Sequence, residues 1–140
     1  TGAVARTYRD IVRVGASRGY HSLGLTYVND DAIEGLCGNS PVANCAELAR
    51  REVINGESVS PLVAVDPANS ITGRLQALLV HLNSTFPNEG WGRYLVSGQV
   101  DYSLITIAGH SQGAGHAGFL AKLRDLNRVV MFSGPTDSGT

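Results

Sequence analysis

The chain carries little charge of either sign and has no long hydrophobic run. Of its 140 residues 16% are charged, with 11 Lys and Arg against 12 Asp and Glu, and the net charge is −1 at pH 7. Because this balance gives no basic surface, we expect neither nucleic acid nor an anionic membrane as a partner. Apolar runs such as ALLV at residues 77–80 are far too short to cross a bilayer, so we expect no membrane span.

Cysteine is also scarce, which limits both metal binding and covalent cross-links. The chain has two cysteines, Cys37 and Cys45. Two thiols do not complete a tetrahedral shell and no histidine has suitable spacing, so we expect no metal and no other cofactor. Their separation of eight residues, within a Gly-Asn-Ser-Pro loop, predicts a small disulfide, with two unpaired thiols as the alternative. A disulfide would favour a secreted or periplasmic protein.

The abundant residues are apolar ones and glycine, and they are arranged around one stretch. A hydrophobic fraction of 43% is typical of an ordered chain, and the length predicts a single domain over residues 1–140. Residues 104–126 are LITIAGHSQGAGHAGFLAKLRDL. The run LITIA predicts a buried strand, and the apolar residues at intervals of three that follow predict a helix.

Between that strand and that helix lies GHSQG at residues 109–113, a G-x-S-x-G pattern. Strand, G-x-S-x-G and helix in this order are typical of a nucleophile elbow, a turn so sharp that the serine backbone is strained. We expect Gly109 and Gly113 to be glycines because a Cβ there would collide with the neighbouring strand or helix. A second match, GASRG at residues 15–19, follows a helical pattern and precedes a strand, so it is interpreted as a helix end and turn.

At these residues the sequence resembles the α/β-hydrolase superfamily, in particular bacterial esterase- or lipase-like members. The resemblance rests on GHSQGAGHAG, on the preceding LITIA and on RVVMFSGPTD after the helix. It implies an α/β fold with a mostly parallel sheet and flanking helices, and hydrolysis of a small-molecule ester or related acyl bond through an acyl-enzyme on Ser111. It also implies two oxyanion donors, the backbone N–H of Gln112 and one from the loop at Gly2. An acyltransferase would use the same turn.

The chain departs from that family in its histidines. In the family the acid and then the histidine follow the serine, but His21, His81, His110 and His116 all precede the strand after the elbow helix. We therefore expect a central segment of a larger hydrolase that is hardly active alone. Asp137, which follows that strand, is the candidate triad acid, with a turn residue as the alternative. His110 and His116 are expected to pack or to form hydrogen bonds around the elbow.

Hydrophobic periodicity predicts further elements around this stretch. Helices are expected over residues 4–18 and 70–86, the second capped by Ser70, and a strand over residues 20–28. A strand over residues 128–133 is expected to lie parallel to the strand before the elbow.

Two other segments and one aromatic residue have more than one interpretation. Residues 35–68 are expected to form a cap-like excursion, either at the mouth of the site, where it would shape substrate access, or as a purely structural loop. Its helix is expected to be capped by Ser40 and to begin at Pro41. Asn29, Asp30 and Asp31 follow the expected strand over residues 20–28, where they are either a turn and helix cap or one wall of a substrate cleft. Trp91 is expected to pack, with sugar stacking as the alternative.

Two other functions compete with hydrolysis. GAGHAG at residues 113–118 is literally G-x-G-x-x-G, and Asp137 lies near the spacing of a ribose-binding acid, which would suit a Rossmann-type dinucleotide-binding domain. Against this, three residues separate the fingerprint from the glycine that ends the strand. The third possibility is a hydrolase-fold protein without catalysis, retained for binding. The sequence does not fix the substrate or the oligomeric state.

Overall fold

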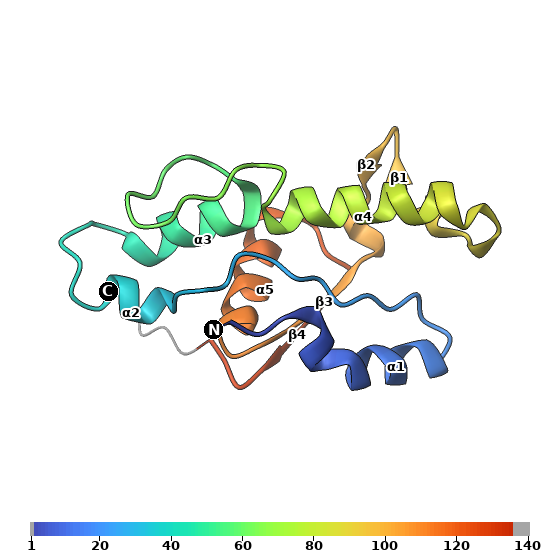
Figure 1. Cartoon of the computed structure of the whole chain (residues 1–140), viewed down its shortest axis with the longest axis horizontal. Coiled ribbons are helices and arrows are strands. Elements are labelled where there is room, and N and C mark those ends of the chain that lie inside the picture. The colour runs from blue at the N-terminus through green and yellow to red at the C-terminus, as the bar shows by residue number, and fades with distance from the viewer. Residues whose placement is uncertain (1, 136–140) are drawn as a thin grey trace.

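The computed structural model of the protein describes residues 2–135, which form a mixed α/β structure that is mostly helical (Figure 1). No helix in this range is both long and apolar enough to span a membrane. The α-helices are α1 (Arg9–Ser17), α2 (Ile33–Cys37), α3 (Cys45–Asn55), α4 (Ile71–Thr85) and α5 (Gln112–Leu123). The 3₁₀ helices are η1 (Ala5–Tyr8), η2 (Pro87–Glu89), η3 (Trp91–Tyr94) and η4 (Tyr102–Leu104). The strands are β1 (Leu95–Val96), β2 (Gln99–Val100), β3 (Thr106–His110) and β4 (Arg128–Phe132).

The strand–helix–strand unit around the elbow is present as the sequence predicts. β3 and β4 pair in parallel with Thr106 opposite Arg128 and His110 opposite Phe132, and α5 connects them. One further hydrogen bond extends the ladder at its carboxyl end, from the Ser111 N–H to the Phe132 carbonyl at 2.9 Å. β1 and β2 form a separate antiparallel hairpin that the hydropathy pattern does not indicate.

Helix α5 covers one face of the β3–β4 sheet, whereas the other face of β3 is largely exposed and meets the segment η1–α1 at one contact. A Cβ on Gly109 would collide with the Gly113 carbonyl, so that face of β3 lies against α5. Side chains alternate along a strand, which places His110 on the opposite face. There the His110 Nδ1 lies 3.2 Å from the Tyr8 hydroxyl at the end of η1. The segment η1–α1 and helix α5 therefore lie on opposite sides of the sheet (Figure 1).

The core lies where α3, α4 and α5 meet. Ile54 and Leu120 are 0% and 1% exposed and pack with Val53, Val65 and Ile71. Figure 1 shows α3 and α4 in a row with α5 beneath them. Three of these five core residues belong to residues 35–68, so the segment expected as a cap-like excursion supplies much of the core against which the elbow helix packs.

The expected strand over residues 20–28 is wrong, because this segment is irregular in the structure. A strand needs a neighbouring backbone for its ladder, and within residues 2–135 β3 pairs with β4 alone. Side chains hold the segment instead. Leu25, Tyr27 and Val28 pack against the core, and Thr26 accepts a hydrogen bond from the Ala5 N–H at 3.0 Å.

The expected start of the helix at Ser40 is also wrong. Ser40 closes a local turn instead, accepting a hydrogen bond from the Val42 N–H at 3.2 Å, and α3 begins only at Cys45. The short helix α2 follows the turn at residues 29–31, as the interpretation of these residues as a turn and helix cap implies, but its N-cap is Ala32, whose side chain cannot cap it. The predicted disulfide is present and joins Cys37, the last residue of α2, to Cys45, the first residue of α3.

Ser70 caps α4 as the sequence predicts, and its removal should measurably lower stability. Its side chain is fully buried, accepts from the Gly73 N–H at 3.1 Å and donates to the Pro67 carbonyl at 2.7 Å. Ser70→Ala is expected to reduce the free energy of unfolding by about 1–2 kcal/mol, measured by urea denaturation. The exposed Ser84, near the other end of α4, is the matched control: Ser84→Ala should cost less than about 0.5 kcal/mol. Equal losses in both variants would contradict the capping role.

Candidate functional site around Ser111

Ser111 has a backbone conformation that residues with a Cβ rarely adopt. Its φ is 53° and its ψ is −121°, which differs from the common left-handed helical region of Asn44, at φ 55° and ψ 30°. The values match the first central residue of a type II′ turn, a position that favours glycine. Ser111 is exposed and directly precedes α5. Such an outlier costs about 1–3 kcal/mol and is characteristic of functional sites.

The glycines near Ser111 differ in how much space the structure leaves for a Cβ at each position. A Cβ on Gly109 would collide with the Gly113 carbonyl, as expected from the sequence. A Cβ on Gly113 would meet only the Tyr27 hydroxyl, at 3.7 Å, so the expected collision at this position is absent from the described structure. Gly134 was not singled out by the sequence, yet a Cβ there would lie 2.7 Å from the Ser111 carbonyl oxygen. The backbone after β4 therefore passes directly against the elbow.

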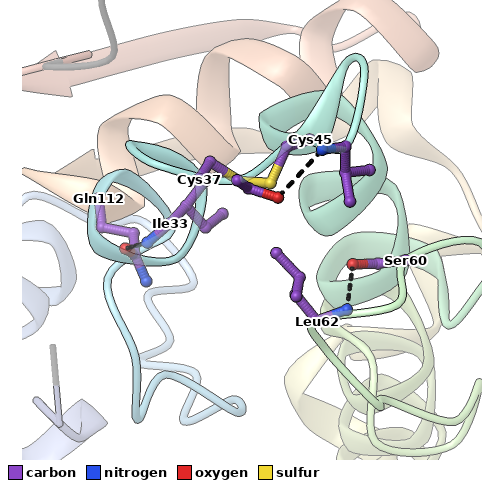
Figure 2. The surroundings of a disulfide bond; sticks show 8 residues. Ile33, Cys37, Cys45, Ser60, Leu62 and Gln112 are labelled. Carbon is purple, nitrogen blue, oxygen red and sulfur yellow. Dashed lines mark hydrogen bonds between the residues drawn. A yellow bond between two sulfur atoms is a disulfide. The ribbon is translucent and has the colours of Figure 1, made fainter.

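The side chain of Gln112 connects the elbow to a loop about 80 residues earlier in the chain. Its Oε1 accepts a hydrogen bond from the Ile33 N–H at 2.9 Å (Figure 2). Its Nε2 donates to the Asn29 side chain at 2.8 Å and to the Asp31 carbonyl at 3.1 Å. One amide thus uses both of its ends to hold the loop over residues 29–33 against the residue that follows Ser111. We refer to these three contacts as the Gln112 clamp.

A hollow of about 120 Å³ lies beside this clamp, and we call it the clamp hollow. Asn29, Asp30 and Asp31 line it together with Gln112, so the two acids that the sequence left open between turn and cleft wall do line a cavity. The remaining lining is apolar and comes from residues 28, 33, 36, 53 and 62–64. Figure 2 shows Ile33 next to Gln112 and Leu62 next to Ser60, both below the disulfide.

The far wall of the clamp hollow is shaped by one buried carboxylate. Glu52 of α3 is 4% exposed. Its Oε2 accepts from the N–H groups of Val59 and Ser60, at 3.1 and 2.7 Å, and its Oε1 accepts from the Val65 N–H at 3.2 Å. These contacts fold the loop between Val59 and Val65 around a single side chain. The lining residues 62–64 lie inside that loop.

No histidine is hydrogen-bonded to the Ser111 side chain within residues 2–135. His110 is paired with Tyr8, and His21 stacks on Trp91 at 4.3 Å with its Nδ1 3.0 Å from the Tyr94 hydroxyl. Trp91 is 8% exposed, which agrees with packing. His81 is exposed on α4.

His116 is buried on α5 beside Arg50 and Tyr27. It is 3% exposed, and its Nδ1 accepts from an Arg50 guanidinium nitrogen at 3.3 Å. Because arginine can only donate, the proton of the neutral ring lies on Nε2, which has no hydrogen-bond partner among the described residues. Burial, reinforced by the Arg50 charge, lowers the pKa of His116 to about 3. His116 therefore stays neutral at ordinary pH and is enclosed away from solvent.

Three predicted site residues remain, namely the oxyanion donors Gly2 and Gln112 and the candidate triad acid Asp137. The backbone N–H of Gly2 donates to the Asn29 carbonyl at 2.6 Å, so it would have to leave this partner to bind an oxyanion. The backbone N–H of Gln112 lies in the first turn of α5, where helix N–H groups lack partners within the helix. Asp137 lies outside the described residues.

The glycines of the G-x-G-x-x-G pattern lie within α5 rather than in the turn before it. A Cβ on Gly115 would collide with the Arg50 guanidinium, and one on Gly118 would approach the Met131 sulfur at 3.1 Å. These two glycines therefore allow close packing of α5. No cluster of three or more potential metal ligands occurs in the part of the chain that the structure describes.

Sequence inspection missed the side chains that organise the loops, namely Gln112, Glu52 and Arg50. The weak signal available was two charged residues, Arg50 and Glu52, next to the expected apolar positions Ala49 and Val53. Nothing local indicates which distant backbone groups they meet.

The two elbow glycines should respond differently to a methyl group. Gly109→Ala is expected to destabilise the protein by about 3 kcal/mol or more, or to prevent folding, because the added Cβ meets backbone. Gly113→Ala, in the first turn of α5, should be neutral or stabilise by up to about 1 kcal/mol through helix propensity. Urea denaturation followed by circular dichroism measures both. Equal destabilisation would show that the packing around the elbow differs from that described.

The lowered pKa of His116 predicts a loss of stability in mild acid. Unfolded histidine titrates near pH 6.5, so below that value the unfolded chain binds a proton that the folded chain binds only near pH 3. Stability is complete above about pH 6.5 and should fall by about 2 kcal/mol between pH 7 and pH 5. Urea unfolding across this range tests it. His116→Asn, which keeps an acceptor near Arg50, should lose this part of the slope; an unchanged slope would contradict the assignment.

Comparison with known proteins assigns the chain to no family. No family model matches the chain, and no match is found among curated proteins or among solved structures. The function is accordingly inferred from the arrangement of residues around Ser111.

Proposed function

We propose that the protein is a serine hydrolase of the α/β-hydrolase type that cleaves an ester or related acyl bond through an acyl-enzyme on Ser111. The observation that carries the proposal is the backbone of Ser111, at φ 53° and ψ −121°, between a parallel strand and a helix. A conformation that favours glycine is occupied by a nucleophilic residue type on an exposed turn. A purely structural turn would gain by having glycine there, since glycine adopts positive φ without strain.

The chemistry follows from the position of Ser111 at the start of α5. The Ser111 Oγ attacks the acyl carbon and its proton passes to a base, while the carbonyl oxygen becomes an oxyanion. The Gln112 N–H and the dipole of the twelve-residue helix α5 would stabilise that charge. The leaving alcohol takes the proton from the base, and water then releases the acid from Ser111. None of the four histidines is hydrogen-bonded to the Ser111 side chain within residues 2–135, so the proposal assigns the role of base to none of them.

Two alternatives have less support. Transfer of the acyl group to an alcohol instead of water would use the same elbow. Dinucleotide binding would need glycines free to approach a pyrophosphate, whereas Gly115 and Gly118 face Arg50 and Met131.

The test is covalent labelling of the longest natural form of the protein with a fluorophosphonate, followed by mass mapping of the adduct. We expect an adduct on Ser111 that is absent in Ser111→Ala. Ser17 lies in the second G-x-S-x-G match, at the end of α1, and its hydroxyl donates to the Val14 carbonyl at 2.8 Å. Ser17→Ala is therefore the matched control and should label like the wild type. A folded protein without an adduct on Ser111 would overturn the proposal.

A further inference from the structure

We propose that the Cys37–Cys45 disulfide is a redox switch on the site at Ser111, and that a dithiol reductant opens it by attacking Cys37. This inference rests on the proposed function, because it concerns the regulation of the same serine. Both cysteines of the chain take part in the bond, which joins the end of α2 to the start of α3. Neither cysteine takes part in the chemistry assigned to Ser111.

The two ends of the disulfide differ in their access to solvent. Cys37 is partly exposed, whereas Cys45 is only 7% exposed. Thiol–disulfide exchange begins when a thiolate attacks one sulfur and displaces the other, so access decides which sulfur is attacked. The incoming thiol therefore bonds to the Cys37 sulfur, and Cys45 leaves as a thiolate.

The position of Cys45 favours its departure. It is the first residue of the eleven-residue helix α3, where the helix dipole is positive and N–H groups lack partners within the helix. In the described structure the side chain of Asn44, the N-cap residue, does not accept from these N–H groups. A helix N-terminus stabilises a thiolate, and a stabilised thiolate leaves faster. Glu47 in the same turn opposes this effect, but it is exposed and its charge is screened by solvent.

A dithiol completes the reduction. Its first thiolate forms a mixed disulfide with Cys37, and its second thiolate attacks the reductant's own sulfur in that bond, so that Cys37 leaves in turn. The dithiol becomes a disulfide, and its two electrons and two protons convert the two cysteines to thiols. Exchange with an oxidised dithiol reverses each step, so the bond can close again.

Opening the bond removes one of the two ends by which α2 is held. This helix has five residues, too few to be stable alone, and it packs against α3. The disulfide fastens its last residue to α3. At its first residue, Ile33 is 2% exposed and its N–H donates to the Gln112 Oε1 at 2.9 Å (Figure 2). Reduction returns conformational freedom to the chain between Cys37 and Cys45, so α2 loses its attachment at the Cys37 end.

Gln112 is the residue through which this change reaches the site. Its side chain makes the three contacts of the Gln112 clamp, and its own backbone N–H is the oxyanion donor of the proposed function. A loosened α2 releases the Gln112 Oε1, and with it the first residue of α5. A donor stabilises an oxyanion only when it is held in place beforehand. The reduced protein is therefore the less active form.

The experiment compares the longest natural form of the protein with and without dithiothreitol, under native conditions. It measures amide hydrogen exchange by NMR and the rate constant of fluorophosphonate labelling of Ser111. Reduction should speed exchange of the Ile33 amide by about tenfold or more. It should slow labelling about tenfold, which is less than the roughly 100- to 1,000-fold cost of losing an oxyanion donor outright. The double variant Cys37→Ser, Cys45→Ser should show the reduced values with or without dithiothreitol.

A second variant tests the route through the Gln112 clamp. Gln112→Ala removes the clamp but keeps the backbone N–H, so it should label as slowly as the reduced wild type. Reduction should slow it little further, because two changes that act through one contact do not add. Gln99 is the matched control, an exposed glutamine in the β1–β2 hairpin at the other end of the molecule from α2 (Figure 1). Gln99→Ala should keep the wild-type response to reduction.

The direction of attack has its own test. Brief exposure of the folded protein to glutathione, followed by alkylation with N-ethylmaleimide, should place glutathione on Cys37 and the alkyl group on Cys45. The reverse distribution would overturn Cys37 as the residue attacked. A bond that dithiothreitol reduces only after the protein is denatured would overturn the switch.

The outcomes separate this inference from the proposed function. Faster exchange at Ile33 with unchanged labelling, or additive effects of reduction and Gln112→Ala, would overturn the switch and retain the hydrolase. Unchanged exchange at Ile33 after complete reduction would also overturn the switch, whatever the labelling shows. Absence of labelling in both redox states of the folded protein would overturn the proposed function, and the switch with it.

Discussion

The reversal of the chain at Ser111 requires positive φ at a residue that carries a Cβ, and the surrounding structure is arranged to hold it there. β4 accepts the Ser111 N–H through Phe132, Gly109 leaves room for the first turn of α5, and Gly134 lets the following backbone approach the Ser111 carbonyl. A strained residue persists only where its neighbours over-determine its conformation. Within the described residues, the main structural role of the parallel pair β3–β4 is therefore to support the turn at Ser111.

A second set of contacts extends this local rigidity to distant segments. Through its side-chain amide, Gln112 holds the loop over residues 29–33, and through Arg50 and His116 the helix α3 packs on α5. The disulfide and Glu52 then fix the segments on either side of α3. A short sheet can support a defined site here because the loops around it are tied by side chains instead of by further strands.

The sequence predicts the parts of this arrangement that are local in the chain. The strand before Ser111, the helix after it, the cap at Ser70 and the disulfide all follow from patterns within a few residues, and the structure contains them. The expected helix start at Ser40 failed because the Ser40 hydroxyl binds Val42 in a local turn that competes with a helix cap. The expected strand over residues 20–28 failed because a strand depends on a neighbouring backbone that is distant in the sequence. For the same reason no pattern indicates that Gln112, Arg50 or Glu52 would organise residues far away, or that Gly113 lacks the close contact expected of it.

Three backbone N–H groups donate to the Glu52 carboxylate, and these hydrogen bonds fix the length of the loop between Val59 and Val65. Val59, Ser60 and Val65 must all reach one carboxylate, so an insertion or deletion between them would pull at least one donor away and leave a buried charge poorly solvated. Side chains at residues 61–64 carry no such constraint. Between Val59 and Val65 the chain can therefore vary in side chain more readily than in length.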